Sequence, residues 1–392
     1  MENLKNNIVL ILINNLDYQD YLPILKDNIF SENLLIIFDK NSITDYKQSP
    51  INYLLQDFNN PEKVISEINN WVKVNDKNIV GIIGLDEEYK YALSKTITDH
   101  FNLKYFDQKI IDIATSKYLQ RTIFKKNNIN VPNFKELINS DIEGINFPNV
   151  IKPVTGISSF FVFKNNNENE LKKNLKTIKS HDPKRTLILE EFIGGDEYSC
   201  DYIVDNKSQA KILRVVKKLT NPRQFPFFEG FYLFNPDHEK GSDFKLKDLQ
   251  DLCSNTAKAI GLKRGVCMMD FKFYNNKLFI IETTIRPGLS QFMELMKKIY
   301  GYTSVEAYLK ELFKLEYSAQ IPKENGLIFY ITTEKTGILK KFDTSILEDN
   351  FEKFGIIDIK KYFNIGDKIK TEKNKAYSEI MIGSISIKNI NM

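Results

Sequence analysis

An acidic, a hydroxyl and a basic side chain follow one another along a short apolar stretch near residue 280. The segment FIIETTIRPGLSQF, residues 279–292, carries Glu282, Thr284 and Arg286 at alternate positions. Alternate residues of a β-strand lie on the same face of a sheet, so these three side chains are expected to share one face. An acid and a guanidinium side by side at the end of a core strand indicate a site for a cation and an anion.

A second acid precedes this strand at a spacing that fits a hairpin. Asp270 lies twelve residues before Glu282, and the pattern predicts a turn at 274–277. A three-residue loop, Asn275–Lys277, places the two acids opposite each other, with Cβ atoms about 4.5–5.5 Å apart. A two-residue loop would shift the register by one and put them on opposite faces.

Two carboxylates at that separation repel unless a positive charge lies between them. A divalent ion such as Mg²⁺ fits this position, and substrate phosphates would supply its other ligands. The alternative is that Asp270 and Glu282 are charges at the rim of the sheet, each paired with a lysine. The apolar neighbours CMM and FII favour the metal site.

The hairpin VCMMDFKFYNNKLFIIETTIRPGLSQF, residues 266–292, resembles the metal-binding hairpin of ATP-grasp enzymes, in particular of ATP-dependent carboxylate–amine ligases. In that family an acid on one strand precedes Glu-x-Asn-x-Arg and a turn with glycine. The resemblance implies that Asp270 and Glu282 bind Mg²⁺ or Mn²⁺. Thr284 stands at the usual Asn position and would be a weaker third ligand. Arg286 would face the phosphoryl group that is transferred.

Three upstream segments resemble the nucleotide-binding parts of the same family, in the expected order. They are ATSKYLQRTIF, VIKPVTGISSFFVF and LILEEFIGGDEYSCD. A fourth, FFEGFYLFNP, residues 227–236, resembles a segment of the amino-acid ligase branch. The implied ATP-binding residues are Lys117, Lys152, Gly156, Ser158, Ser159, Glu190, Glu191, Ile193 and Glu197.

Each part of the nucleotide has an expected partner. Lys117 and Lys152 would bind the phosphates, and Lys152 together with Arg286 would be catalytic. Residues 155–159 would form a loop that closes over the phosphates through Gly156 and the two serines. The adenine would lie against Ile193 and the backbone of the Glu190–Glu191 region, and Glu197 would accept hydrogen bonds from the ribose hydroxyls.

The resemblance implies an enzyme that activates a carboxylate as an acyl phosphate and joins it to an amine, releasing ADP and phosphate. The expected partners are a small-molecule carboxylate, for which an amino acid is favoured, and an amine. Alternatives remain open: a biotin carboxylase-like or purine-pathway enzyme, an enzyme that loads amino acids onto a carrier protein, and an ATP-binding regulatory protein without catalysis.

A basic cluster follows the expected ribose acid. Arg214, Lys217, Lys218 and Arg223 lie in LRVVKKLTNPRQF. These residues would either attract ATP or a carboxylate, or form a charged strand edge that limits aggregation.

The remaining pattern predicts an α/β chain with several lobes. Apolar runs alternate with helical segments over 1–108, which predicts a Rossmann-like parallel sheet, although no G-x-G-x-x-G follows the first strand. The resemblance places a small ATP-grasp lobe at 109–185 and a large lobe with the metal site at 186–310. A β-rich lobe is expected at 311–392, and residues 220–245 are expected to be a loop.

Composition limits the classes of partner and compartment. Lys and Arg number 55 and Asp and Glu 51, so the net charge is +4, which gives no argument for nucleic-acid binding. Three separated cysteines indicate reduced thiols in a cytoplasmic protein, and three histidines make a zinc site unexpected. The apolar run at residues 8–13 is too short to span a membrane, so no membrane partner is expected. A homodimer is expected only by analogy with such enzymes.

Overall fold

The computed structural model describes the greater part of the chain in thirteen ranges and one single residue. These are residues 6–13, 30–41, 51–84, 91–103, 107–137, 142, 146–156, 159–221, 225–234, 244–288, 290–315, 325–333, 335–370 and 381–388.

The N-terminal part forms a parallel four-stranded sheet, as the alternating pattern predicted. Its strands are β1 (Asn7–Ile13), β2 (Leu34–Asp39), β3 (Tyr53–Gln56) and β4 (Asn78–Gly84), in the order β3-β2-β1-β4. The short helix η1 (Ser31–Asn33) precedes β2, and helices α2 (Pro61–Val74) and α3 (Tyr91–His100) flank β4 in sequence. Strand β1 is almost entirely buried, which suits a parallel sheet covered on both faces.

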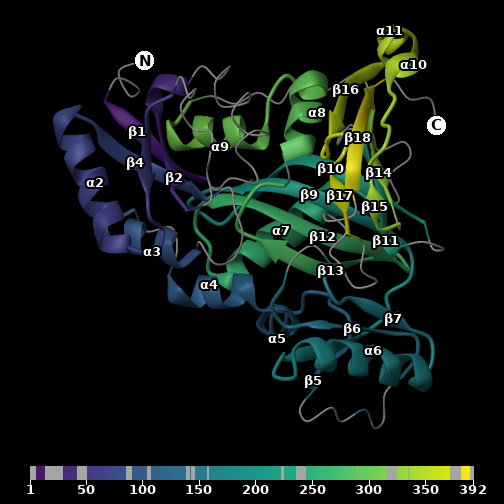
Figure 1. Ribbon diagram of the computed structural model, residues 1–392. Helices are drawn as coiled ribbons and strands as arrows, with labels where there is room; N and C mark the ends of the chain where they lie inside the picture. Colours follow the sequence, from purple (N-terminus) through teal and green to yellow (C-terminus); the bar gives the residue numbers. More distant parts are fainter. Residues whose placement is uncertain are drawn as a thin grey trace.

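A small lobe lies at the bottom of Figure 1. It contains the antiparallel strands β5 (Phe134–Leu137), β6 (Asn149–Pro153), β7 (Phe163–Asn165) and β8 (Leu187–Glu191), in the order β5-β8-β6-β7. Helix α6 (Glu168–His181) packs its apolar face against them through Leu171, Leu175 and Ile178. Helices α4 (Gln108–Thr115) and α5 (Lys117–Lys126) precede this lobe.

An antiparallel sheet of eight strands forms the centre of the molecule (Figure 1). Its order is β13-β12-β9-β10-β11-β14-β18-β16. The strands are β9 (Asp196–Val204), β10 (Ala210–Asn221), β11 (Phe225–Phe234), β12 (Gly265–Tyr274), β13 (Lys277–Thr284), β14 (Gly326–Thr332), β16 (Ile356–Lys361) and β18 (Met381–Lys388). The expected loop at 220–245 is therefore wrong in part, because β11 pairs with both β10 and β14.

Helices cover both faces of this sheet. Cys267 packs in the core that contains α7 (Leu246–Ile260), whereas its neighbour Val266 packs in the core that contains α8 (Ser290–Tyr300) and α9 (Ser304–Leu312). Since consecutive strand residues point to opposite faces, α7 lies on one face and α8 and α9 on the other. The core around α9 also contains the apolar strands of the N-terminal sheet.

The C-terminal segment adds strands to the central sheet and two smaller features. Strands β15 (Gly337–Ile338) and β17 (Lys368–Ile369) form a separate pair, and the one-turn helices α10 (Ser345–Glu348) and α11 (Phe351–Phe354) lie at the top of Figure 1. Strands before and after residue 311 thus share one sheet. The four lobe boundaries given above stay a proposal.

The hairpin of β12 and β13 differs from the expected one, yet it joins the same two acids. The turn has two residues, Asn275 and Asn276, with φ values of 48° and 58°, so the expected three-residue loop is wrong. A β-bulge restores the pairing: Phe271 is opposite Ile280 and Asp270 is opposite Glu282, so Ile281 is the extra residue. Consecutive residues face opposite ways, so buried Phe271 lies on the core face and both acids on the other.

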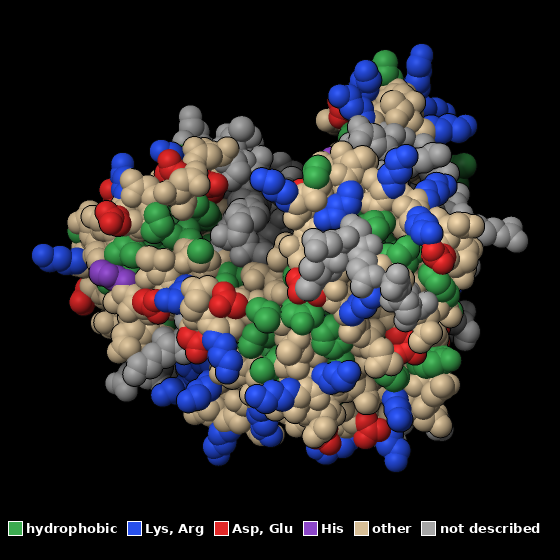
Figure 2. All heavy atoms as spheres, turned by 90° about the horizontal axis from the view of Figure 1, so that it is seen from below, with side chains coloured by type: hydrophobic (Ala, Val, Ile, Leu, Met, Phe, Trp, Pro, Cys, Tyr) green, Lys and Arg blue, Asp and Glu red, His purple; other side chains and the backbone are tan. Residues whose placement is uncertain are grey.

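Charge is spread over the surface. On the face shown in Figure 2, Lys and Arg side chains are distributed around the molecule and interspersed with acidic ones. None of the helices among the described residues is long and apolar enough to cross a membrane.

Candidate active site

Each of the two hairpin acids is held by its own lysine. Lys117 Nζ lies 2.8 Å from Glu282 Oε1, and Lys218 Nζ lies 2.5 Å from Asp270 Oδ2. Burial acts to raise the pKa of Glu282, but the Lys117 ammonium outweighs it and holds that pKa below the ordinary value. Burial raises the pKa of Asp270, and the nearby carboxylates of Glu197 and Glu282 add to that effect. In this structure each acid thus already has a lysine ammonium as its cationic partner.

Lys117 also connects the hairpin of β12 and β13 to the loop that is expected to bind phosphates. Ser116 caps the N-terminus of α5 by accepting a hydrogen bond from Leu119 N, so that α5 begins at Lys117. From there, Lys117 Nζ donates a 2.7 Å hydrogen bond to the carbonyl of Gly156. The backbone N–H of Lys117 donates to the carbonyl of Val154 at 2.9 Å. One side chain therefore links the acid Glu282 to the loop that follows β6.

A second buried network joins the small lobe to the hairpin. Glu190 Oε2 lies 2.7 Å from Lys152 Nζ, and Glu190 Oε1 lies 2.8 Å from Arg121 Nε. Arg121 donates to the carbonyl of Ile281, the extra residue of the bulge. Burial lowers the pKa of Lys152, while Arg121 and Lys152 together overcome the burial of Glu190 and keep its pKa low.

This network contains two predicted residues, Lys152 and Glu190, and one residue that was not predicted, Arg121. The side chain of Glu190 is an internal counter-ion of Lys152, and Glu190 lies on β8 between β5 and β6. Arg121 was not selected from the sequence. The available signal was its position four residues after Lys117, which places both on one face of α5.

Two members of the basic cluster on β10, Lys218 and Arg214, form buried ion pairs, and Lys217 pairs with Asp196. The alternative of a charged strand edge is wrong, because β10 lies between β9 and β11. Lys218 Nζ is 2.9 Å from Glu197 Oε1 as well as 2.5 Å from Asp270. Burial acts to lower the pKa of Lys218, but these two acids raise it well above its ordinary range. The side chains of Arg223 and of the segment 227–236, which resembles the amino-acid ligase branch, lie outside the described residues.

Arg214 forms the second pair, with Asp201, and both side chains are fully buried. Asp201 accepts from Arg214 Nη2 at 2.7 Å, from the backbone N–H of Gly288 at 3.0 Å and from Ser304 Oγ at 2.6 Å. A Cβ on Gly288 would lie only 2.1 Å from Arg214 Nη2, so this position requires glycine. The hydrogen bonds of Asp201 hold the turn that follows Arg286 against β9 and the N-terminus of α9.

The oxygen atoms around the hairpin fit a hard divalent cation. In the described part of the chain, Asp270 Oδ1, Thr284 Oγ1 and Ser199 Oγ are buried without a hydrogen-bond partner. Carboxylate and hydroxyl oxygens are suitable ligands for Mg²⁺, and unpaired buried oxygens gain from a cation. No group of three or more His, Cys, Asp or Glu among the described residues is arranged to hold a metal alone.

The other predicted nucleotide residues are distributed as follows. Gly156 has φ of +148° and Ser159 has φ of +55°, and Ser158 lies outside the described residues. Ile193 is buried, at 4% exposure, whereas Glu191 is exposed and accepts a 2.8 Å hydrogen bond from Asn133. Arg286 is half-buried at the end of the hairpin and donates to the carbonyl of Pro287 at 3.0 Å.

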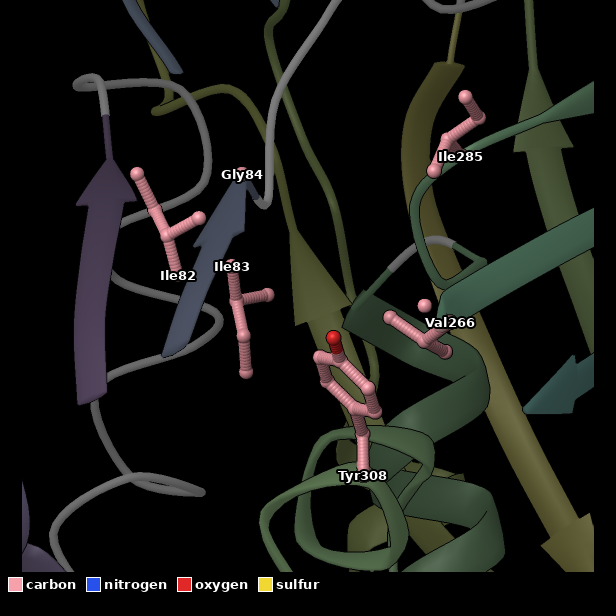
Figure 3. A pocket seen from close by; sticks show the side chains of 7 residues that line it. Ile82, Ile83, Gly84, Val266, Ile285 and Tyr308 are labelled. Atoms are coloured by element: carbon pink, nitrogen blue, oxygen red, sulfur yellow. The ribbon is translucent and has the colours of Figure 1, made fainter. Parts of the chain in front are cut away.

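A small pocket lies where the N-terminal sheet meets the central sheet (Figure 3). Ile83 and Gly84 come from the carboxyl end of β4, Val266 from β12, Ile285 from the turn after β13, and Tyr308 from α9. The carboxyl ends of strands in open α/β sheets are where ligands bind. The pocket is lined by Ile285, the residue before Arg286.

Comparisons with known proteins agree with this geometry. Residues 145–289 match the family described as the ATP-grasp domain. A D-alanine–D-alanine ligase of Pelagibacter ubique is 32% identical over 46% of this chain and 60% of its own length. A second, from Leptospira interrogans, is 29% identical over 41% of this chain and 46% of its own. The chain thus matches less than two thirds of the length of these curated relatives.

Solved structures share the fold over nearly the whole chain. An L-amino acid ligase from Bacillus licheniformis superposes with a TM-score of 0.77 and 17% identity, covering 98% of this chain and 94% of its own. An N5-carboxyaminoimidazole ribonucleotide synthetase from Thermotoga maritima gives a TM-score of 0.67 and 14% identity, with coverages of 98% and 94%. At these identities the likeness establishes the fold, which is the mixed α/β arrangement predicted above.

Proposed function

The chain contains an ATP-grasp domain over residues 145–289, and from this premise we propose that it is an ADP-forming carboxylate–amine ligase. Its carboxylate substrate would be an amino acid, and its second substrate an amine. The observation that carries the proposal is the pairing of Asp270 with Glu282 across the bulged hairpin, beside unpartnered oxygens of the described site.

Asp270 and Glu282 would hold Mg²⁺, with Thr284 as a neutral third ligand. When bound, Mg²⁺ neutralises charge on the β- and γ-phosphates and so assists phosphoryl transfer. Lys117 lies against both Glu282 and the phosphate loop, so it would contact the phosphates without a large movement. Lys152 reaches the same region from β6, with its charge balanced by Glu190.

The proposed reaction has two steps. A carboxylate oxygen of the substrate attacks the γ-phosphorus, a P–O bond forms, and the bond to the β-phosphate oxygen breaks to release ADP. The amine nitrogen then attacks the acyl carbon, loses a proton and expels phosphate, which leaves an amide. The fork of the Arg286 guanidinium suits the oxyanions that develop in both steps. Positioning and charge stabilisation account for the absence of a nucleophilic side chain from this scheme.

Purified protein with ATP, Mg²⁺ and mixtures of amino acids should release ADP and phosphate. Release that requires two amino acids supports the ligase, whereas release that requires bicarbonate supports the carboxylase alternative. Glu282→Gln should abolish ADP formation while circular dichroism still shows the native fold. Wild-type ADP formation by this variant would remove Glu282 from the metal site.

The sequence-based expectations on compartment and assembly belong to this proposal. We place the protein in the cytoplasm, without nucleic-acid or membrane partners, and as a homodimer. Light scattering after size-exclusion chromatography measures the mass in solution, and a mass near 45.7 kDa would contradict the dimer.

A further inference from the structure

Lys218 reaches from one strand of the central sheet to the acids of two others. It lies on β10 opposite Glu197 of β9, and Asp270 lies opposite Ser199 of the same strand. Its ammonium is 2.9 Å from Glu197 Oε1 and 2.5 Å from Asp270 Oδ2. The Lys218 side chain is 13% exposed, so water screens these contacts only weakly.

The two acids that Lys218 joins have different proposed roles. Glu197 is the expected ribose acid and Asp270 the expected metal ligand. Because the ammonium holds Asp270 Oδ2 at 2.5 Å, only Oδ1 is left for a divalent ion, and the neighbouring positive charge weakens binding of that ion by repulsion. Lys272 stands farther away, 3.8 Å from Glu197 Oε2, and no ion pair between it and Asp270 is found in the described structure.

We propose that Lys218 is a resident cation of this site, which occupies Asp270 until a metal–nucleotide complex replaces it. The inference rests on the proposed function for the identity of the ligand. Replacement by a free metal ion is opposed by repulsion between two cations. Replacement by the metal–nucleotide complex is favoured, because the phosphates give the displaced ammonium a new anionic partner. Lys218 therefore makes metal binding depend on the nucleotide and positions Asp270 for it.

Mn²⁺ binding to the full-length protein without nucleotide tests this directly, by electron paramagnetic resonance of the free ion. Lys218→Met keeps the length of the side chain and removes its charge. This variant should bind Mn²⁺ about tenfold more tightly than the wild type, or better, because the competing ammonium is gone. Lys217→Met is the matched control: Lys217 is the next residue of β10, pairs with Asp196 and should leave Mn²⁺ affinity unchanged. Lys218→Arg, which keeps a charge, should stay as weak as the wild type.

Equal Mn²⁺ affinity of wild type and Lys218→Met overturns the proposal. A second comparison needs only the wild type and Asp270→Asn, and so decides the matter even if Lys218→Met does not fold. These two proteins should bind nucleotide-free Mn²⁺ equally weakly, and tight binding that Asp270→Asn abolishes would refute the proposal. Mn²⁺ binding requires no ligase substrate, so a failed ligase assay would leave this result intact.

Discussion

Replacing Glu190 by Gln should destabilise the protein strongly, because it leaves two buried cations without their anion. Glu190 is 4% exposed and lies within 2.8 Å of both Arg121 and Lys152. Removing one partner of a buried ion pair costs about 3–5 kcal/mol. For 392 residues unfolding together, the entropy of unfolding is about 0.8 kcal/mol per kelvin, so the melting temperature should fall by about 4–6 °C.

The assay is thermal unfolding followed by circular dichroism, with Glu191→Gln as the control. Glu191 is the next residue of β8, is exposed and accepts one hydrogen bond from Asn133, so its replacement should change stability by less than about 0.5 kcal/mol. The same small change in Glu190→Gln would refute the description of Glu190 as an internal counter-ion.

The low pKa of Glu190 also predicts how the stability difference between wild type and Glu190→Gln depends on pH. The pKa of Glu190 is held below its ordinary value of 4.5, so its contribution is fully present above that value and is lost as the pH falls. The gap between wild type and Glu190→Gln should therefore be constant near neutral pH and narrow below about pH 4. A gap that widens on acidification would contradict the assigned direction.

Other substitutions and one chemical probe test the remaining contacts. Arg121→Met should cost about 3–5 kcal/mol, and the double variant with Glu190→Gln should lose less than the sum of the two, as a double-mutant cycle in melting would show. Gly288→Ala should reduce the rate of ADP formation by about tenfold or more, because the new Cβ would displace Arg214, and a wild-type rate would contradict the packing described. Burial raises the pKa of Cys253 and Cys267, so both should react slowly with iodoacetamide at pH 8 in the native protein and rapidly in denaturant, as mass spectrometry would measure.

The sequence was sufficient for those parts of the fold that depend on periodicity. Apolar runs predicted β1, β2 and β4, because the burial of these strands determines the pattern. The sequence did not predict strand β11, residues 225–234, because this strand is defined by its pairing with β10 and β14. Pairing of this kind depends on the arrangement of distant segments.

The candidate active site could likewise be predicted only in part. Asp270 and Glu282 were predicted to be neighbours, but by the wrong loop. The two-residue turn and the bulge at Ile281 offset each other, and the bulge carbonyl is satisfied by Arg121 from a helix 160 positions earlier. The spacing of residues near Ile281 cannot predict a hydrogen-bond partner so distant in the sequence. Lys218 was noticed as part of a basic cluster, but its contact with Asp270 requires the order of β10, β9 and β12.

The proposed activity depends on phosphoryl transfer from ATP to a carboxylate. Amino acids labelled with ¹⁸O in their carboxylates, supplied with ATP, Mg²⁺ and the wild-type protein, test it through the phosphate released, analysed by ³¹P nuclear magnetic resonance. Transfer through an acyl phosphate predicts one ¹⁸O atom in each phosphate, with ADP as the other product. Unlabelled phosphate, or AMP with pyrophosphate, would contradict the claim.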